Sequence, residues 1–330
     1  MNKPKVCIVF TGGTISMTVD EQMGAAIPTL SGEQILSMVS NIDKLADSEV
    51  INFSEIPGPH MTIDKLIELK KLIQKKLNEP GITGVIVTHG TDSLEETAYF
   101  LDLTIQHMKP VVIVGAMRSS SELGYDGSSN LAAAVCTAIS EKAKNRGVLV
   151  VLNNEVNLAS EVTKTSTIAL NTFQSPYGPL GAVDANDLIL YRDIAYRQYI
   201  DTDRVERRVD LIKAVLDMDG RFINYAVDSG AVGLVIEAMG RGNLPLAMVE
   251  GIKYALSKGC IVVVVSRCHS GRVFESYGYA GGGKELSDLG VIMGGDMRGP
   301  KARLKLMLAL GKTRDREKIR ALFKEENYNL

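Results

Sequence analysis

Residues 84–96 have the sequence GVIVTHGTDSLEE, and this stretch decides the fold that we expect for the chain. Residues 85–87 form a short apolar run that is typical of a buried strand, and polar residues follow it directly. Ser93 and Glu96 match the spacing of a capping box, and apolar residues then recur at helical spacing. The stretch therefore predicts a strand, a polar turn and a helix in succession.

The polar turn carries Thr88, Thr91 and Asp92 at the carboxyl end of the predicted strand. In open α/β sheets, ligands bind in the crevice at the carboxyl ends of the strands. Two hydroxyls and a carboxylate at that position are suited to chemistry. Thr91 and Asp92 could equally act only as caps of the helix, so the turn alone leaves both interpretations open.

A second stretch repeats this pattern at the start of the chain. Residues 6–10 form an apolar run of strand length, and TGGTI follows at residues 11–15. The segment lacks G-x-G-x-x-G and Gly-Lys-Ser/Thr, which argues against a nucleotide site. Adjacent glycines such as Gly12 and Gly13 let amide N–H groups converge on an oxyanion. Residues 16–31 are small and polar, and they predict a mobile loop that could close over a site.

Strands alternate with helices along the rest of the chain. This pattern predicts an α/β protein with a larger N-terminal, doubly wound, mainly parallel sheet domain at residues 1–190. A charged segment at residues 191–213 predicts a linker, and residues 214–330 predict a smaller C-terminal α/β domain. The further strands that we expect are residues 111–114, 147–152, 215–216, 233–236, 261–265 and 291–293, and the further helices are residues 63–76, 128–143, 245–258 and 300–310.

Composition excludes several classes of function. The chain has 330 residues, of which 45% are hydrophobic, and a formal net charge of −2. This charge balance gives no footprint for nucleic acid, and no apolar run is long enough to span a membrane or serve as a signal peptide. We therefore expect a cytoplasmic location. The four histidines show no metal-ligand spacing, so we expect no metal site.

Five motifs, taken together and in order, resemble the bacterial-type L-asparaginase family. They are TGGTI at 11–15, THGTDS at 88–93, GAMR at 115–118, VTKT at 162–165 and YGPLG at 177–181. The resemblance continues into residues 301–303 and the closing helices, so it covers essentially the whole chain. It implies hydrolysis of the side-chain amide of asparagine to aspartate and ammonia, through a covalent acyl-enzyme on threonine and without a metal or organic cofactor.

The resemblance also assigns roles to residues by their positions in the motifs. Thr14 matches the primary nucleophile, Thr91 and Lys164 match a second hydroxyl and its base, and Asp92 matches the residue that holds the substrate α-ammonium group. General chemistry agrees, because a threonine hydroxyl needs a base to become a nucleophile. A carboxylate near a helix start also stays ionised. The amides near Gly12, Gly13 and Gly90, with Ala116 close to them, are candidates for stabilising the oxyanion.

This sequence departs from the family pattern at the substrate pocket. The lid tyrosine of the family is matched by Ala26, and the side chains that grip the substrate carboxylate are matched by Gly58 and Pro59. Only backbone groups or His60 remain to bind that carboxylate. Many members of the family also lend a glutamate to the site of a neighbouring subunit. The glycine-rich residues 281–283 offer no glutamate for that role.

Two tyrosines offer a replacement for the lid tyrosine. Tyr277 and Tyr279 lie in a glycine-rich loop that could reach the site of the same or an adjoining subunit. A tyrosine in such a loop can equally pack its ring with its hydroxyl in water. The Thr91 and Lys164 pair is the other candidate for taking the Thr14 proton, and for Tyr279 we expect a role between positioning Thr14 and accepting its proton.

We therefore expect an amidohydrolase that acts on L-asparagine and assembles as a homo-oligomer, a dimer or a dimer of dimers, as the family resemblance implies. One alternative is a related amidase that acts on glutamine, a D-amino acid amide or another small amide. Another is a non-catalytic paralogue that binds an amino acid. A further relative, the amide-hydrolysing subunit of a tRNA-dependent amidotransferase, would be expected to carry an additional N-terminal domain.

Overall fold

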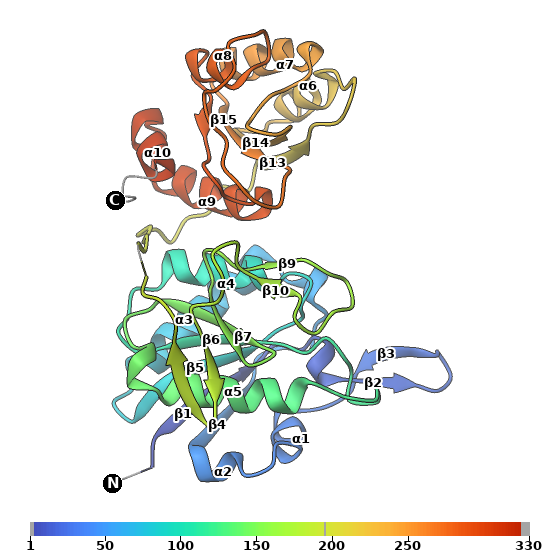
Figure 1. Cartoon of the computed structure of the whole chain (residues 1–330), viewed down its shortest axis with the longest axis vertical. Helices are drawn as coiled ribbons and strands as arrows, with labels where there is room; N and C mark the ends of the chain where they lie inside the picture. Colours follow the sequence, from blue (N-terminus) through green and yellow to red (C-terminus); the bar gives the residue numbers. More distant parts are fainter. Residues whose placement is uncertain (1–2, 195, 325–330) are drawn as a thin grey trace. The chain divides into compact units, whose positions relative to one another are not determined.

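The computed structural model describes residues 3–194 and 196–324, and the chain divides into two compact units, Met1–Tyr199 and Ile200–Leu330 (Figure 1). We expected a linker at residues 191–213, of which residue 195 lies outside the described residues. The last five residues of that segment form strand β13 (Val209–Lys213). Apolar residues between the charges allow this strand, since Val209 is fully buried. The boundaries of our expected domains, 1–190 and 214–330, stay a prediction.

The first unit is built on an eight-stranded sheet with the order β12-β11-β8-β7-β6-β5-β1-β4. The strands from β4 to β7 in this order run parallel, and β8, β11 and β12 extend the sheet in antiparallel pairing. This arrangement confirms the expected mainly parallel α/β fold. The bounds are β1 Lys5–Phe10, β4 Asp47–Asn52, β5 Ile82–Thr88, β6 Val111–Val114, β7 Val148–Leu152, β8 Glu155–Leu158, β11 Gly181–Asp184 and β12 Asp187–Leu190.

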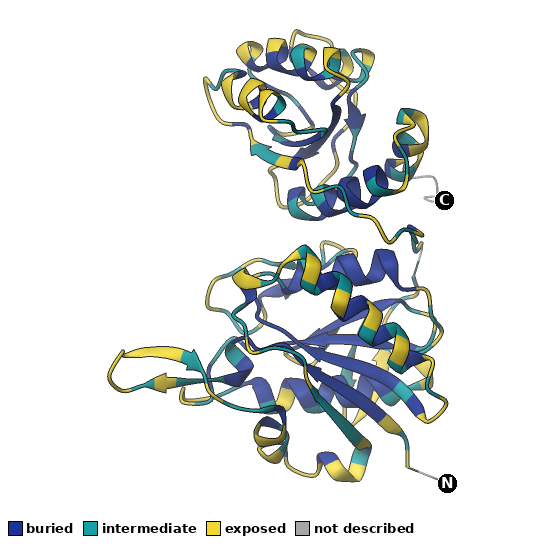
Figure 2. Ribbon diagram, turned by 180° about the vertical axis from the view of Figure 1, so that it is seen from behind, coloured by how far each residue is buried: buried dark blue, intermediate teal, exposed yellow. Residues whose placement is uncertain are grey.

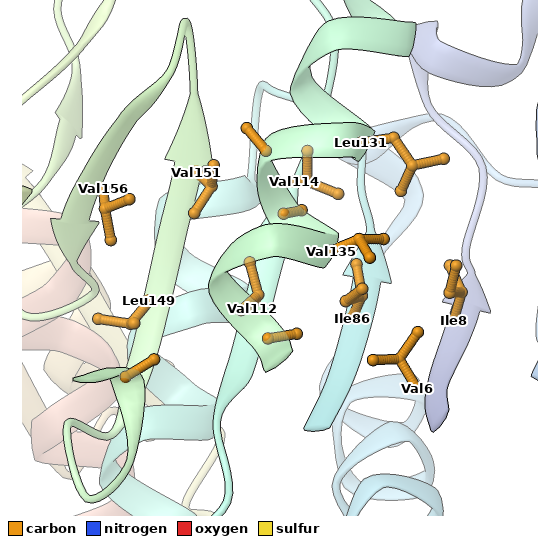
Figure 3. Close-up of a cluster of buried hydrophobic side chains, with 14 of the residues drawn as sticks. Val6, Ile8, Ile86, Val112, Val114, Leu131, Val135, Leu149, Val151 and Val156 are labelled. Atoms are coloured by element: carbon orange, nitrogen blue, oxygen red, sulfur yellow. The ribbon is translucent and has the colours of Figure 1, made fainter. Parts of the chain in front are cut away.

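Helices cover both faces of this sheet, which is why its central strands are apolar on both sides. Helix α5 (Gly127–Ile139) packs on β5, β6 and β7, while α3 (Ile63–Leu77) packs on β5 and α4 (Leu94–Thr104) on β6 and β7. Figure 3 shows Leu131 and Val135 of α5 against alternate residues of the strands. Figure 2 shows the same strands buried and the outer sides of the helices exposed.

Shorter elements complete the first unit. Their bounds are η1 Thr14–Ser16, β2 Met17–Asp20, β3 Ala25–Pro28, α1 Gly32–Ser37, α2 Ile42–Leu45, η2 Gly58–His60, η3 Glu141–Ala143, β9 Thr163–Lys164 and β10 Phe173–Gln174.

The segment at residues 16–31, which we expected to be a loop, contains a β-hairpin instead, and its mobility stays a prediction. Strands β2 and β3 pair in antiparallel register from Met17 opposite Pro28 to Asp20 opposite Ala25. Asp20 Oδ1 accepts hydrogen bonds from two backbone N–H groups of the turn, and Gly24 takes a positive φ of 61°. The expectation failed because small residues can pair as strands when the turn between them is fixed. Figure 1 shows the hairpin projecting from its unit.

The second unit carries a four-stranded parallel sheet with the order β13-β14-β15-β16. Helix α9 packs on β13, β14 and β15, while α6 packs on β13 and α7 on β15. The expected strand at residues 215–216 is wrong, because Leu216 is 87% exposed and the pair lies in the turn after β13. The remaining bounds are α6 Arg221–Asp228, β14 Gly233–Ala238, α7 Leu246–Ser257, β15 Ile261–Ser266, α8 Gly283–Asp288, β16 Ile292–Met293, α9 Gly299–Lys312 and α10 Arg316–Phe323.

None of the helices within residues 3–194 and 196–324 combines the length and the apolar composition needed to cross a bilayer.

Candidate active site

Three backbone segments meet at the carboxyl ends of neighbouring strands in the first unit, and each contributes a glycine. A Cβ atom built on Gly13 would lie 2.4 Å from Gly90 Cα, and one built on Gly90 would lie 2.6 Å from Gly58 N. Only glycine permits such backbone contact. The contact brings the turn after β1, the turn after β5 and the segment after β4 together at one edge of the sheet.

Thr14 starts the short 3-10 turn η1 directly after this glycine contact. Gly13 has a φ of 87°, a backbone conformation that glycine adopts without strain. The Thr14 side chain is half-buried. Among residues 3–194 and 196–324, no hydrogen-bond partner of the Thr14 hydroxyl is found. The hydroxyl can therefore bond to a ligand at the strand ends.

Thr91, Asp92 and Lys164 form a connected side-chain group. Lys164 Nζ donates a hydrogen bond to Thr91 Oγ1 at 2.9 Å and lies 2.8 Å from Asp92 Oδ1. Thr91 is 6% exposed, whereas the side chain of Asp92 is 63% exposed and that of Lys164 is 18% exposed. Because the ammonium group donates to Thr91 Oγ1, the Thr91 hydroxyl hydrogen is left to point toward another acceptor.

Glu95 fixes the strand that carries Lys164, and our sequence reasoning assigned it no role. Its Oε2 accepts hydrogen bonds from the backbone N–H of Lys164 at 2.5 Å and from Thr163 Oγ1 at 2.7 Å. Glu95 is 9% exposed, so both contacts exchange little with water. The sequence carries no local signal for this role, because the burial of Glu95 and its donors 68 and 69 residues away are visible only in the fold.

His89 links the turn after β5 to helix α4. It is 1% exposed, and its ring nitrogens lie 2.8 Å from Gly90 O and 2.9 Å from Thr97 Oγ1. Since a carbonyl only accepts, Nδ1 carries the ring proton and Nε2 accepts from Thr97. Burial lowers the pKa of His89 to about 4. The residue is therefore a neutral brace for the Gly90 backbone at neutral pH.

The expected capping box at Ser93 and Glu96 is wrong. Ser93 is the N-cap of α4, but its side chain makes no capping hydrogen bond. Ser93 Oγ instead donates to the carbonyl of Gly58 at 2.5 Å. This tertiary contact takes the place of the local cap, and it attaches the segment after β4 to the helix start. Pro59 and His60 follow Gly58 in η2, and both are exposed.

Ala116 follows β6, and its side chain is fully buried. Its neighbour Gly115 lies against the turn after β5, because a Cβ built on Gly115 would be 3.2 Å from Thr91 Cγ2. The Gly13 N–H, which we expected near an oxyanion, donates to Ile56 O at 3.1 Å instead. This amide is therefore committed to the backbone, and it does not serve as an oxyanion donor in this arrangement.

The residues at the departures from the family pattern have the following surroundings. Ala26 is exposed on β3, opposite Val19. Tyr277 and Tyr279 belong to the second unit, where their rings lie 5.6 Å apart with an interplanar angle of 33°. Whether either ring reaches Thr14 stays a prediction.

Comparisons with known proteins agree with these motifs along the chain. Residues 5–196 match the family model described as Asparaginase, N-terminal, and residues 208–323 match the Glutaminase/Asparaginase C-terminal domain. The chain is 38% identical over 311 residues to the L-asparaginase of Bacillus licheniformis, covering 94% of this chain and 96% of that protein. It is 36% identical over 332 residues to L-asparaginase 2 of Bacillus subtilis (strain 168), covering 98% of this chain and 86% of that protein. It also superposes, with a TM-score of 0.88 and 34% identity, on the crystal structure of a probable cytoplasmic L-asparaginase from Campylobacter jejuni, covering 97% of this chain and 99% of that one.

Proposed function

Because the chain belongs to the asparaginase family, we propose that it hydrolyses the side-chain amide of L-asparagine to L-aspartate and ammonia. One observation carries this proposal. Lys164 Nζ contacts both Thr91 Oγ1 and Asp92 Oδ1, and the glycine contact brings the backbone of the Thr14 turn against the same turn. A threonine hydroxyl as nucleophile, a lysine amine as proton acceptor and a carboxylate for the substrate ammonium group are sufficient for covalent hydrolysis of an amino-acid amide.

The proposed reaction has two halves. Thr14 Oγ attacks the amide carbon, its proton passes to the departing nitrogen, and ammonia leaves an ester between Thr14 and the aspartyl group. Water then attacks the ester carbon, and the bond to Thr14 Oγ breaks to release aspartate and restore the hydroxyl. In both halves Lys164 acts as the neutral amine: it takes up the proton through the Thr91 hydroxyl and returns it, since Nζ lies within hydrogen-bond distance of Thr91 Oγ1.

Substrate binding in this proposal uses charges at the rim. Asp92 receives the α-ammonium group, because its exposed carboxylate keeps acceptor sites beyond the one bonded to Lys164. Gly58 and Pro59 offer no polar side chain, so backbone groups or His60 receive the α-carboxylate. Ala116 is fully buried and follows Gly115, whose backbone lies against Thr91, so it stays our candidate for the buried side of the substrate site.

A related activity on another small amide is the second candidate. Gly58 and Pro59 replace the side chains that hold the α-carboxylate in the family resemblance, and this change bears on substrate choice more than on reaction class. Release of ammonia from L- and D-asparagine, glutamine and simple amides separates the candidates. Turnover of L-asparagine above all others supports the first candidate, and a different preferred amide supports the second.

Two substitutions test the assignment of the threonines. We expect Thr14→Ala and Thr91→Ala each to lower turnover about 1000-fold or more while the melting temperature stays near that of the parent, because both lie in turns at strand ends. Thr83→Ala is the matched control, since Thr83 lies at the opposite end of β5. Ammonia release at the parental rate from either active-site variant contradicts the proposal, and so does a parent protein that releases no ammonia.

We also propose that the protein is cytoplasmic and forms a dimer or a dimer of dimers that acts on a small-molecule amide, without nucleic acid or membrane partners. The family resemblance supports the assembly, since that family completes its sites between subunits. Light scattering of the active protein tests it. An active monomer contradicts it.

A further inference from the structure

The backbone around Thr14 is held by a continuous series of hydrogen bonds to its carbonyl groups. Gly13 O accepts from the N–H and the hydroxyl of Ser16, at 2.9 and 2.8 Å, and Thr14 O accepts from Met17 N. Ser16 O accepts from the backbone N–H groups of residues 29 and 30, each at 3.0 Å. The position of Thr14 therefore depends on the satisfaction of every carbonyl in this short turn.

The carbonyl of Ile15 is the exception, because a distant side chain satisfies it. Tyr125, from the loop between β6 and α5, donates its hydroxyl to Ile15 O at 2.9 Å. No second donor to this carbonyl is present in the described part of the chain, residues 3–194 and 196–324. Ile15 is fully buried, so water does not readily replace the hydroxyl.

The Tyr125 ring is placed by a glycine at the start of α5. A Cβ atom built on Gly127 would lie 2.2 Å from the Tyr125 hydroxyl oxygen and 2.3 Å from Cζ. The ring also packs against the hydrophobic core of the first unit. Burial raises the pKa of Tyr125 well above its ordinary value, so the phenol stays protonated and keeps its donor.

We propose that Tyr125 is a positioning residue for Thr14, because its hydroxyl fixes the adjacent peptide of the turn that carries the nucleophile. This inference rests on the proposed role of Thr14. The Tyr125 hydroxyl bonds to a backbone carbonyl and touches no reacting atom, so it does not act as the base. It stabilises the turn from the loop before α5, whereas the hairpin β2–β3 carries Ala26 where the family has a tyrosine.

The same loop supplies a matched control. Ser120 Oγ donates to Met17 O at 3.0 Å, but the Ser120 backbone N–H donates to the same carbonyl at 3.1 Å. Ser120→Ala therefore removes a hydroxyl from the same loop and leaves its target carbonyl satisfied. Tyr125→Phe removes a hydroxyl and leaves its target carbonyl without a donor.

The test measures turnover and the binding of L-aspartate separately. We expect Tyr125→Phe to lower kcat about 10-fold, because a small displacement of a nucleophile costs turnover, with the Kd for L-aspartate within twofold of the parent. Ser120→Ala should leave both quantities within twofold. Gly127→Ala keeps the hydroxyl but pushes the ring away, so it should reproduce the loss of kcat even if Tyr125→Phe folds poorly.

The outcomes separate this inference from the proposed function. If Thr14→Ala turns over like the parent, Thr14 is not the nucleophile and both proposals fall. If Thr14→Ala is inactive while Tyr125→Phe and Gly127→Ala keep kcat within twofold, only the role of Tyr125 is overturned. A parallel loss of kcat and of L-aspartate binding also overturns it, because that pattern indicates general damage to the pocket.

Discussion

The two threonines of the candidate site are held in different ways. Thr91 lies in a network of side chains, in which Lys164 bonds to it and to Asp92 while Glu95 fixes the strand of Lys164. Thr14 lies at a contact between backbones, where Gly13 and Gly90 touch without side chains between them. Activity should therefore depend, around Thr91, on the charge and hydrogen-bonding groups of the side chains. Around Thr14, stability should depend on the volume of the residues at the glycine contact.

The largest effect that we expect comes from Lys164→Met. This change removes the donor to Thr91 and the partner of Asp92 together, and it should lower kcat about 1000-fold, since a positioned acid or base contributes about 10²–10⁴-fold. Lys142→Met is the matched control, because Lys142 pairs with Asp187 in a solvent-exposed salt bridge. Ammonia release assays on both variants decide the outcome. A loss below tenfold for Lys164→Met would remove the lysine from the mechanism.

The glycine contact beside Thr14 should be destabilised when a methyl group is added to one of its glycines, although the polarity does not change. Gly90→Ala places a Cβ 2.6 Å from Gly58 N, and overpacking of this kind costs about 3 kcal/mol of unfolding free energy. Gly81→Ala is the control, because nothing lies within 4 Å of its added Cβ. Denaturant unfolding measures both variants. Equal stabilities for the two would show that the strand ends can separate at little cost.

Acid should lower the free energy of unfolding through His89, which lies in the turn after β5. The unfolded chain takes up a proton near the ordinary histidine pKa of about 6.5, whereas the folded protein takes it up only near pH 4. The unfolding free energy should therefore fall by about 3 kcal/mol in total as pH decreases from 6.5 to 4. It should recover when the pH is raised again.

The control for this pH dependence is His89→Gln, which has no titrating ring. Denaturant unfolding at several pH values should give a difference between parent and variant that changes across this window and is constant above pH 7. A difference that stays constant down to pH 4 would show that His89 does not titrate in this manner.

The smallest effect should come from Glu95→Gln, which keeps the shape of the side chain and removes its charge. We expect kcat to fall about tenfold, because hydrogen bonds to a charged group contribute about 1.5–3 kcal/mol and the amide retains part of this. Glu141→Gln is the control, since Glu141 pairs with Lys144 and its side chain is 78% exposed. Comparison of kcat for the two variants measures how far the network extends beyond Lys164. Matching kcat values would confine it to Lys164, Thr91 and Asp92.

Much of the fold followed from local patterns in the sequence. The apolar runs at residues 6–10, 85–87 and 111–114 predicted central strands, because strands buried on both faces are continuously apolar. Leu216 misled us, since an apolar residue next to a valine can lie in a turn. Strand β4 (Asp47–Asn52) was not expected, because its residues are mostly polar and only partly buried at the sheet edge.

The candidate site was less accessible from sequence than the fold. The motif resemblance pointed to Thr91 and Lys164, which the structure brings within 2.9 Å although they are 73 residues apart. Ser93 looked like a local cap, yet its hydroxyl bonds to Gly58, 35 residues away. Contacts of this kind depend on which strand ends meet, and no local spacing encodes that. The contact of Tyr125 with Ile15 could not be predicted for the same reason, because the two residues are 110 positions apart.

The glycine contact also constrains how this protein can change over generations. Gly13 and Gly90 come from two distant segments, yet an added Cβ at either position would lie 2.4 to 2.6 Å from backbone atoms. A substitution at either position therefore meets backbone rather than a movable side chain. We expect these two glycines to be retained together, while Gly58, Pro59 and His60 vary and alter which amide the lineage prefers.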